Sequence, residues 1–232
     1  MNQPEKHPHI PARNLLDRIV LGGSDGAIET LALTSALNGA GVGYGTIELA
    51  GVAFAVSGAL SMFFSSYLSR KSELKSLEID AKRERMEIET EPEEEKSEMR
   101  ELLIKDGYSD KEVEVIMSRL VGDKDLWLKE MLRRELRVNV EDVGSDPYFR
   151  PLSAGLAFLF MSLSVLVPYA FSIPRFDSLF ASVTISLAAL FALGSRVFIP
   201  KIFDLRSGLE SALVGAVAGT LLYLVGVLLS AA

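Results

Sequence analysis

An apolar run changes abruptly into a charged one within the sequence Gly58-Ala59-Leu60-Ser61-Met62-Phe63-Phe64-Ser65-Ser66-Tyr67-Leu68-Ser69-Arg70-Lys71. The apolar run begins at Ile47, which makes it long enough as a helix to cross a hydrocarbon layer about 30 Å thick. The charged segment, residues 70–146, holds 23 of the 31 acidic residues and 16 of the 24 basic ones, so it carries the whole net charge of −7. Apolar and charged parts of this chain are therefore separated along the sequence.

Four further apolar runs flank this segment, one before it and three after. The five predicted membrane spans are Ile19–Leu37, Ile47–Leu68, Leu152–Phe171, Leu179–Phe198 and Leu209–Leu229. The first run continues into a full span, so we expect a retained membrane helix rather than a cleaved signal peptide. The sequence predicts an all-α membrane protein, with five transmembrane helices and a helical insertion between the second and third. The predicted parts are residues 1–69, 70–149 and 150–232.

Basic residues near the span ends predict the orientation. They gather on one side of the predicted membrane, as Arg13, Arg18, Arg70, Lys71, Arg150, Arg196, Lys201 and Arg206, whereas residues 38–46 contain none. Because basic loops stay in the cytoplasm, the N-terminus and the charged segment are expected there, and the C-terminus outside. We expect a prokaryotic plasma membrane, with a vacuolar membrane as the alternative.

The charged segment is predicted to be helical. Residues 70–89 are strong helix formers without Pro or Gly, so the second span should continue into them. Pro92 should start a further helix that ends near Lys105. A capping box at Ser109 to Glu112 should begin the next helix, and Asp123 should cap the last one.

The composition excludes several classes of protein. With no cysteine and only His7 and His9, disulfides, thiolate sites and histidine-rich zinc sites are excluded. An acidic charged segment argues against nucleic acid as a partner. No set of nucleophile, base and oxyanion donors can be named, so we do not expect an enzyme.

Two pairs of glutamates lie on either side of Pro92, each pair spaced to share one face of a helix: Glu84 with Glu87, and Glu95 with Glu98. If the helices fold back on each other, four carboxylates meet, and a divalent cation would relieve their repulsion. Met131 and Glu135 could add a thioether, which favours a transition metal, and a fifth carboxylate. The alternatives are a solvated acidic face for the glutamates and a core position for Met131.

Asp25 and Glu29 lie one helical turn apart inside the first predicted span. An acid at membrane depth is costly and usually marks a path for ions or protons. Met62, in the second span, could be a ligand on such a path, although by itself it is more typical of ordinary helix packing.

These residues together resemble the vacuolar iron transporter family of plants, fungi, archaea and bacteria, over nearly the whole chain. The matching motifs are Asp25-Gly26, Gly58-Ala59-x-Ser61-Met62, Tyr67-Leu68-Ser69, Arg83-Glu84-Arg85-x-Glu87-Ile88, Pro92-Glu93-Glu94-Glu95 and Met131-x-x-x-Glu135-Leu136. The resemblance implies a homodimer that exports Fe²⁺, and often Mn²⁺, from the cytoplasm in exchange for protons, with no prosthetic group. It implies that Asp25 and Met62 line the path at the dimer interface. It also implies that Glu84, Glu87, Glu95, Glu98, Met131 and Glu135 collect metal at the cytoplasmic side.

The chain departs from the family at Ser66, where the family commonly has a glutamate, and at Glu29, where a small or hydroxyl residue is more usual. Our hypothesis is that Glu29 supplies the missing carboxylate. Carboxylate and thioether ligands leave the choice between iron and manganese open. The competing interpretation is a membrane-anchored metal sensor or scaffold without transport.

Overall fold

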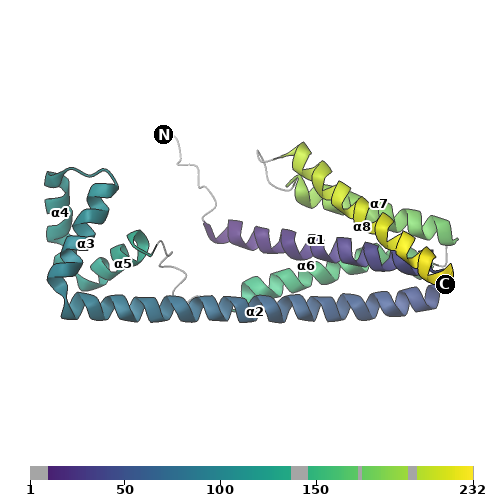
Figure 1. The fold of residues 1–232 in the computed structure, drawn as a ribbon, viewed down its shortest axis with the longest axis horizontal. Helices are drawn as coiled ribbons and strands as arrows, with labels where there is room; N and C mark the ends of the chain where they lie inside the picture. Colours follow the sequence, from purple (N-terminus) through teal and green to yellow (C-terminus); the bar gives the residue numbers. More distant parts are fainter. Residues whose placement is uncertain (1–9, 137–145, 172–173, 198–202, 232) are drawn as a thin grey trace, which may run out of the picture. The chain divides into compact units, whose positions relative to one another are not determined.

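The computed structural model describes residues 10–136, 146–171, 174–197 and 203–231, and all regular structure in these ranges is helical (Figure 1). The helices are α1 (Ile10–Gly39), α2 (Tyr44–Thr90), α3 (Pro92–Lys105), α4 (Asp110–Val121), α5 (Lys124–Arg134), α6 (Phe149–Leu166), the 3-10 helix η2 (Val167–Phe171), α7 (Arg175–Gly194) and α8 (Leu205–Ala231). The predicted all-α class is confirmed, and α2 continues from the apolar run into the charged segment without a break.

The chain divides into two compact units, which we describe separately. The first, the membrane unit, comprises Met1–Tyr67 and Tyr148–Ala232; the second, the charged unit, comprises Leu68–Pro147. Helix α2 contributes residues 44–67 to the first and residues 68–90 to the second.

Within the membrane unit, α1 packs against α6, α7 and α8 (Figure 1). The closest approach to α6 is at Gly22 and Gly26, where an added Cβ would collide with the carbonyl oxygens of Ala154 and Phe158. Glycines four residues apart let two helix backbones touch, which is typical of membrane helix pairs. The backbones of α1 and α6 are therefore in direct contact at these two glycines.

Helix α8 approaches α1 in the same way further along. A Cβ on Gly226 would collide with the carbonyl of Ala36. Gly215 and Gly219, also four residues apart on α8, are buried, but they face side chains of α7 and α1 rather than a backbone. On the other side of α6, the ring of Phe158 fills the space beside Gly58 of α2.

Within the described residues, four helices are long and apolar enough to cross a membrane: Tyr44–Thr90, Phe149–Phe171, Asp177–Gly194 and Leu205–Ala231. Each contains most of one predicted span; Phe198, the predicted end of the fourth, lies outside the described residues. The first predicted span lies within α1, which does not meet this criterion. Its charged residues, among them Asp17, Arg18, Asp25 and Glu29, lower its mean hydropathy, so the count of five spans is not confirmed.

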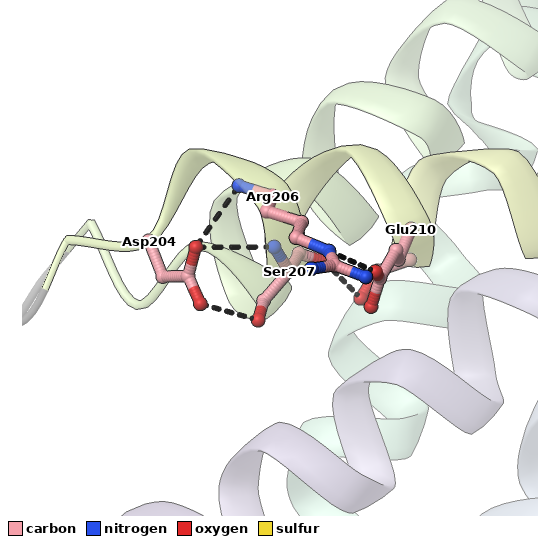
Figure 2. Close-up of polar contacts among 5 residues, drawn as sticks. Asp204, Arg206, Ser207 and Glu210 are labelled. Carbon is pink, nitrogen blue, oxygen red and sulfur yellow. Dashed lines mark hydrogen bonds and ion pairs between the residues drawn. The ribbon is translucent and has the colours of Figure 1, made fainter.

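The start of α8 is fixed by Asp204, which lies just before the helix (Figure 2). Its carboxylate accepts hydrogen bonds from the backbone amides of Arg206 (3.0 Å) and Ser207 (3.3 Å) and from the Ser207 hydroxyl (2.7 Å). These bonds, those from Ser207 above all, lower the pKa of Asp204. One turn on, Arg206 pairs with Glu210 at 2.9 Å. Such capping satisfies the free amides of a helix N-terminus.

The charged unit has an apolar core of its own. Ten buried side chains from α2 to α5 form it: Ile88, Met99, Leu103, Val113, Met117, Leu120, Trp127, Leu128, Met131 and Leu132. The helix starts predicted here are confirmed. Pro92 occupies the first turn of α3, Ser109 and Glu112 form the capping box of α4, and Asp123 accepts from the Leu126 amide at the start of α5.

Candidate functional site

The two acids of α1 lie close to the glycines at which α1 contacts α6, and they differ from those glycines in burial. Gly22 and Gly26 face α6, whereas Asp25 is half-buried and Glu29 is exposed. Neither carboxylate forms a hydrogen bond or ion pair with another side chain in the described part of the chain. Because an unpaired carboxylate in an apolar helix bundle is costly, this face of α1 requires water, a cation or a second chain beside it.

Met62 belongs to the same unit, on α2. Its side chain is half-buried, and its sulfur accepts a weak hydrogen bond from the hydroxyl of Ser66 at 3.9 Å. Ser66 is the position at which the resemblance led us to expect a glutamate, and in the single chain its hydroxyl contacts the thioether.

In the charged unit, two of the predicted carboxylates are buried together. Glu84 of α2 is 4% exposed and Glu95 of α3 is 6% exposed, and their side chains are hydrogen-bonded to each other. Glu84 is also hydrogen-bonded to Glu135, which follows α5. One oxygen of Glu84 and one of Glu95 remain buried without any hydrogen-bond partner in the described chain.

This burial changes the acidity of the glutamates. Burial, together with the charges of Glu135 and Glu95, raises the pKa of Glu84 to about 8. Burial likewise raises the pKa of Glu95 and of Glu135. At neutral pH Glu84 therefore holds a proton, through which it can donate a hydrogen bond to a neighbouring carboxylate.

The other predicted ligands differ in their surroundings. Glu87 is half-buried and pairs with Arg83 at 2.9 Å, and Glu98 is exposed, but the charges of both raise the pKa of Glu95. Met131 is fully buried in the apolar core. In the ranges that the structure covers, no three acidic or histidine side chains are arranged to hold one metal ion. Glu84 is hydrogen-bonded to Glu95 and Glu135, but the five carboxyls do not surround a common point.

Sequence reasoning missed a set of buried hydroxyls in the membrane unit. Ser178, Ser182 and Ser186 recur every four residues on α7 and are fully buried, as is Ser162 on α6. Their spacing places them on one helical face, which is a signal that the sequence does contain. Each donates a hydrogen bond to a main-chain carbonyl of a neighbouring element.

Comparison with known proteins places these features in a family. The sequence model of the VIT family matches residues 16–227. "Vacuolar iron transporter 1" of Arabidopsis thaliana is 32% identical over 90% of this chain and 84% of its own length. "Vacuolar iron transporter 2" of Oryza sativa subsp. japonica is 31% identical (90% and 85%), and "Vacuolar iron transporter" of Plasmodium berghei is 31% identical (97% and 86%). The chain, an integral membrane protein, belongs to the VIT family.

Proposed function

We propose that the protein moves ferrous iron, and manganese as a second cargo, out of the cytoplasm in exchange for protons. Family membership over nearly the whole chain carries the proposal, because the similar proteins are named iron transporters. Transport by a membrane protein, rather than enzymatic catalysis, is the activity that these names support.

In this proposal the metal path runs beside α1. Helix α1 itself also crosses the membrane, so that there are five spans in all. The support is its unpaired acid pair, Asp25 and Glu29, in a helix that is otherwise packed among apolar spans. A carboxylate can hold either a proton or a divalent cation, so the two compete for the same group. Metal leaving on the far side lets a proton take its place, and exchange follows without ATP. Met62 supplies a soft ligand on this path.

The charged unit is proposed to collect metal before transport. Glu84, Glu87, Glu95, Glu98 and Glu135 interact electrostatically, and two buried oxygens among them lack partners. A divalent cation would displace the shared proton and pull these carboxylates around it, with the Met131 sulfur becoming a ligand after a side-chain rearrangement. This makes the unit the metal-binding insertion of the proposed architecture.

A second copy of the chain is proposed to cover the acidic face of α1. Glu29 is exposed in the single chain, and lipid would be an unfavourable neighbour for it. Because the chain has no cysteine, Glu29→Cys introduces a unique thiol, and oxidation should cross-link two copies in membranes. Phe180→Cys, on an exposed position of α7, is the control that should not cross-link.

The membrane and the orientation are also proposals. The basic residues at the span ends support a cytoplasmic N-terminus and charged unit, with the C-terminus on the other side. The plasma-membrane expectation gains no support from the relatives, which are named vacuolar transporters. The vacuolar membrane, or a compartment equivalent to it, is therefore the better proposal.

Uptake of Fe²⁺ and Mn²⁺ into proteoliposomes tests the function. Metal accumulation that needs the protein and responds to a pH gradient is expected. The competing sensor or scaffold function predicts metal binding without accumulation, and that result would overturn the proposal.

A further inference from the structure

Two buried serines hold the turn of α1 between its acids. The hydroxyl of Ser162, on α6, donates to the carbonyl oxygen of Gly26 at 3.3 Å. The hydroxyl of Ser186, on α7, donates to the carbonyl oxygen of Ala27 at 3.1 Å. Both serines are fully buried, and Gly26 and Ala27 lie between Asp25 and Glu29 in the sequence.

These two hydrogen bonds act on a part of α1 whose backbone is also in direct contact with α6. The carbonyls of Gly26 and Ala27 each accept a bond from an amide four residues on within α1, and a carbonyl oxygen has a second lone pair for a serine. At Gly26 the backbone of α6 leaves no room even for a Cβ. The backbone contact blocks movement of α1 toward α6, and the two hydroxyls oppose its rotation and its movement away.

We propose that Ser162 and Ser186 are positioning residues, which fix the direction in which Asp25 and Glu29 face the transported metal. This inference rests on the proposed transport function. Small displacements of a ligand reduce metal affinity, because coordination bonds require defined distances and directions. The serines contact neither the acids nor the metal and act through the backbone of α1.

The alternative is that these bonds only join helices, and Ser182 provides the matched control. It is one turn before Ser186 on the same face of α7, equally buried, and donates to the Val165 carbonyl of α6 at 2.8 Å. Removing it costs an interhelical bond of the same kind. Ser182 makes no direct bond to α1 and connects to it only through the Tyr169 hydroxyl, which bonds to Asn38, well beyond the two acids. Serine to alanine leaves the Gly26 and Ala27 carbonyls with their own helical bonds, and each substitution removes one interhelical hydrogen bond, so the variants should fold.

The test measures Fe²⁺ and Mn²⁺ uptake by the full-length protein in proteoliposomes over a range of metal concentrations. The double variant Ser162→Ala/Ser186→Ala should raise KM for Fe²⁺ about two- to tenfold, the equivalent of one weakened hydrogen bond, and change the Fe²⁺ to Mn²⁺ ratio. The maximal rate should change less. Ser182→Ala should keep the original KM and ratio, even if it lowers thermal stability equally.

A double variant with the same KM and metal ratio as Ser182→Ala would overturn the positioning role. Asp25→Asn, measured in the same preparation, separates this failure from that of the proposed function. If Asp25→Asn loses transport while the serine variants behave like the control, only the positioning role fails. If Asp25→Asn transports normally, the acid path fails, and the positioning role fails with it.

Discussion

Carboxylates are handled differently in the two units of this protein. In the membrane unit, Asp25 and Glu29 have no hydrogen-bond or ion-pair partners among the described side chains, while nearby buried hydroxyls are satisfied by main-chain carbonyls. In the charged unit, Glu84 and Glu95 are buried against each other. The first arrangement leaves the acids without a side-chain partner, and the second keeps a proton among crowded acids. Under the proposed function, acidic residues would therefore serve metal passage in the membrane unit and metal capture in the charged unit.

The largest expected effect is the loss of metal transport when the acid path of α1 is removed. Asp25→Asn should lower Fe²⁺ uptake by at least about tenfold, because an interaction with a charged ligand contributes about 1.5 to 3 kcal/mol. Radioactive iron uptake into proteoliposomes measures it. Asp17→Asn removes a charge from the same helix at an exposed position and is the control. Equal uptake by Asp25→Asn and Asp17→Asn would remove the acid path.

Loss of metal collection by the charged unit should have a smaller effect, which is seen only at low metal concentrations. Changing Glu84, Glu87, Glu95 and Glu98 together to Ala should raise KM for Fe²⁺ by about tenfold or less, because local charge attracts counter-ions, while uptake at saturating metal changes little. The same measurement on a control with Glu89, Glu91, Glu94 and Glu101 changed to Ala, all exposed, removes the same number of glutamates outside the cluster. If the two quadruple variants have the same KM, the charged unit does not collect metal through this cluster.

The proton held by Glu84 predicts that the stability of the charged unit depends on pH. The pKa of Glu84 is about 8 in the folded chain, against 4.5 ordinarily, so the folded form binds the proton more tightly. The stabilisation is complete below about pH 4.5 and is lost as pH rises to about 8. Trp127 is the only tryptophan and lies in the charged unit's core, so its fluorescence reports unfolding of this unit.

The unfolding temperature of the charged unit should therefore be several degrees lower at pH 8 than at pH 6 in metal-free detergent solution. Glu84→Gln cannot release this proton and should flatten the dependence. An unfolding temperature that rises between pH 6 and pH 8 would show that Glu84 is ionised in the folded chain.

The smallest effect separates stability from transport. Asp123→Ala removes the cap of α5 and should cost about 1 kcal/mol of stability in the charged unit, again read from Trp127 fluorescence. Metal uptake should stay the same, because Asp123 is not part of the carboxylate cluster. Ser97→Ala, at an exposed position in α3, is the neutral control. A clear loss of uptake by Asp123→Ala would connect α5 packing to transport.

Local chemistry made much of the fold predictable. Pro92, Ser109 and Asp123 start helices through groups within three residues of themselves, so the sequence is sufficient to place them. Apolar runs likewise predicted the helices that can span a membrane.

Features that depend on a neighbouring helix were not predictable in the same way. The contact of Gly26 with α6 and the bond from Ser186 to Ala27 require knowledge of which helices pack together. Spacing paired Glu95 with Glu98, but it would equally pair Glu94 with Glu98, although Glu95 is buried and Glu94 is exposed. Burial against Glu84 distinguishes them, and it follows from how α3 packs on α2 and α5.

Metal-driven proton movement tests the central claim most directly. Proteoliposomes carrying a pH-sensitive dye should show proton flux on addition of Fe²⁺, and a smaller or equal flux with Mn²⁺, while Asp25→Asn should show neither metal uptake nor proton flux. Metal entry without any proton movement, or an unchanged proton flux in Asp25→Asn, would contradict exchange at the carboxylates of α1.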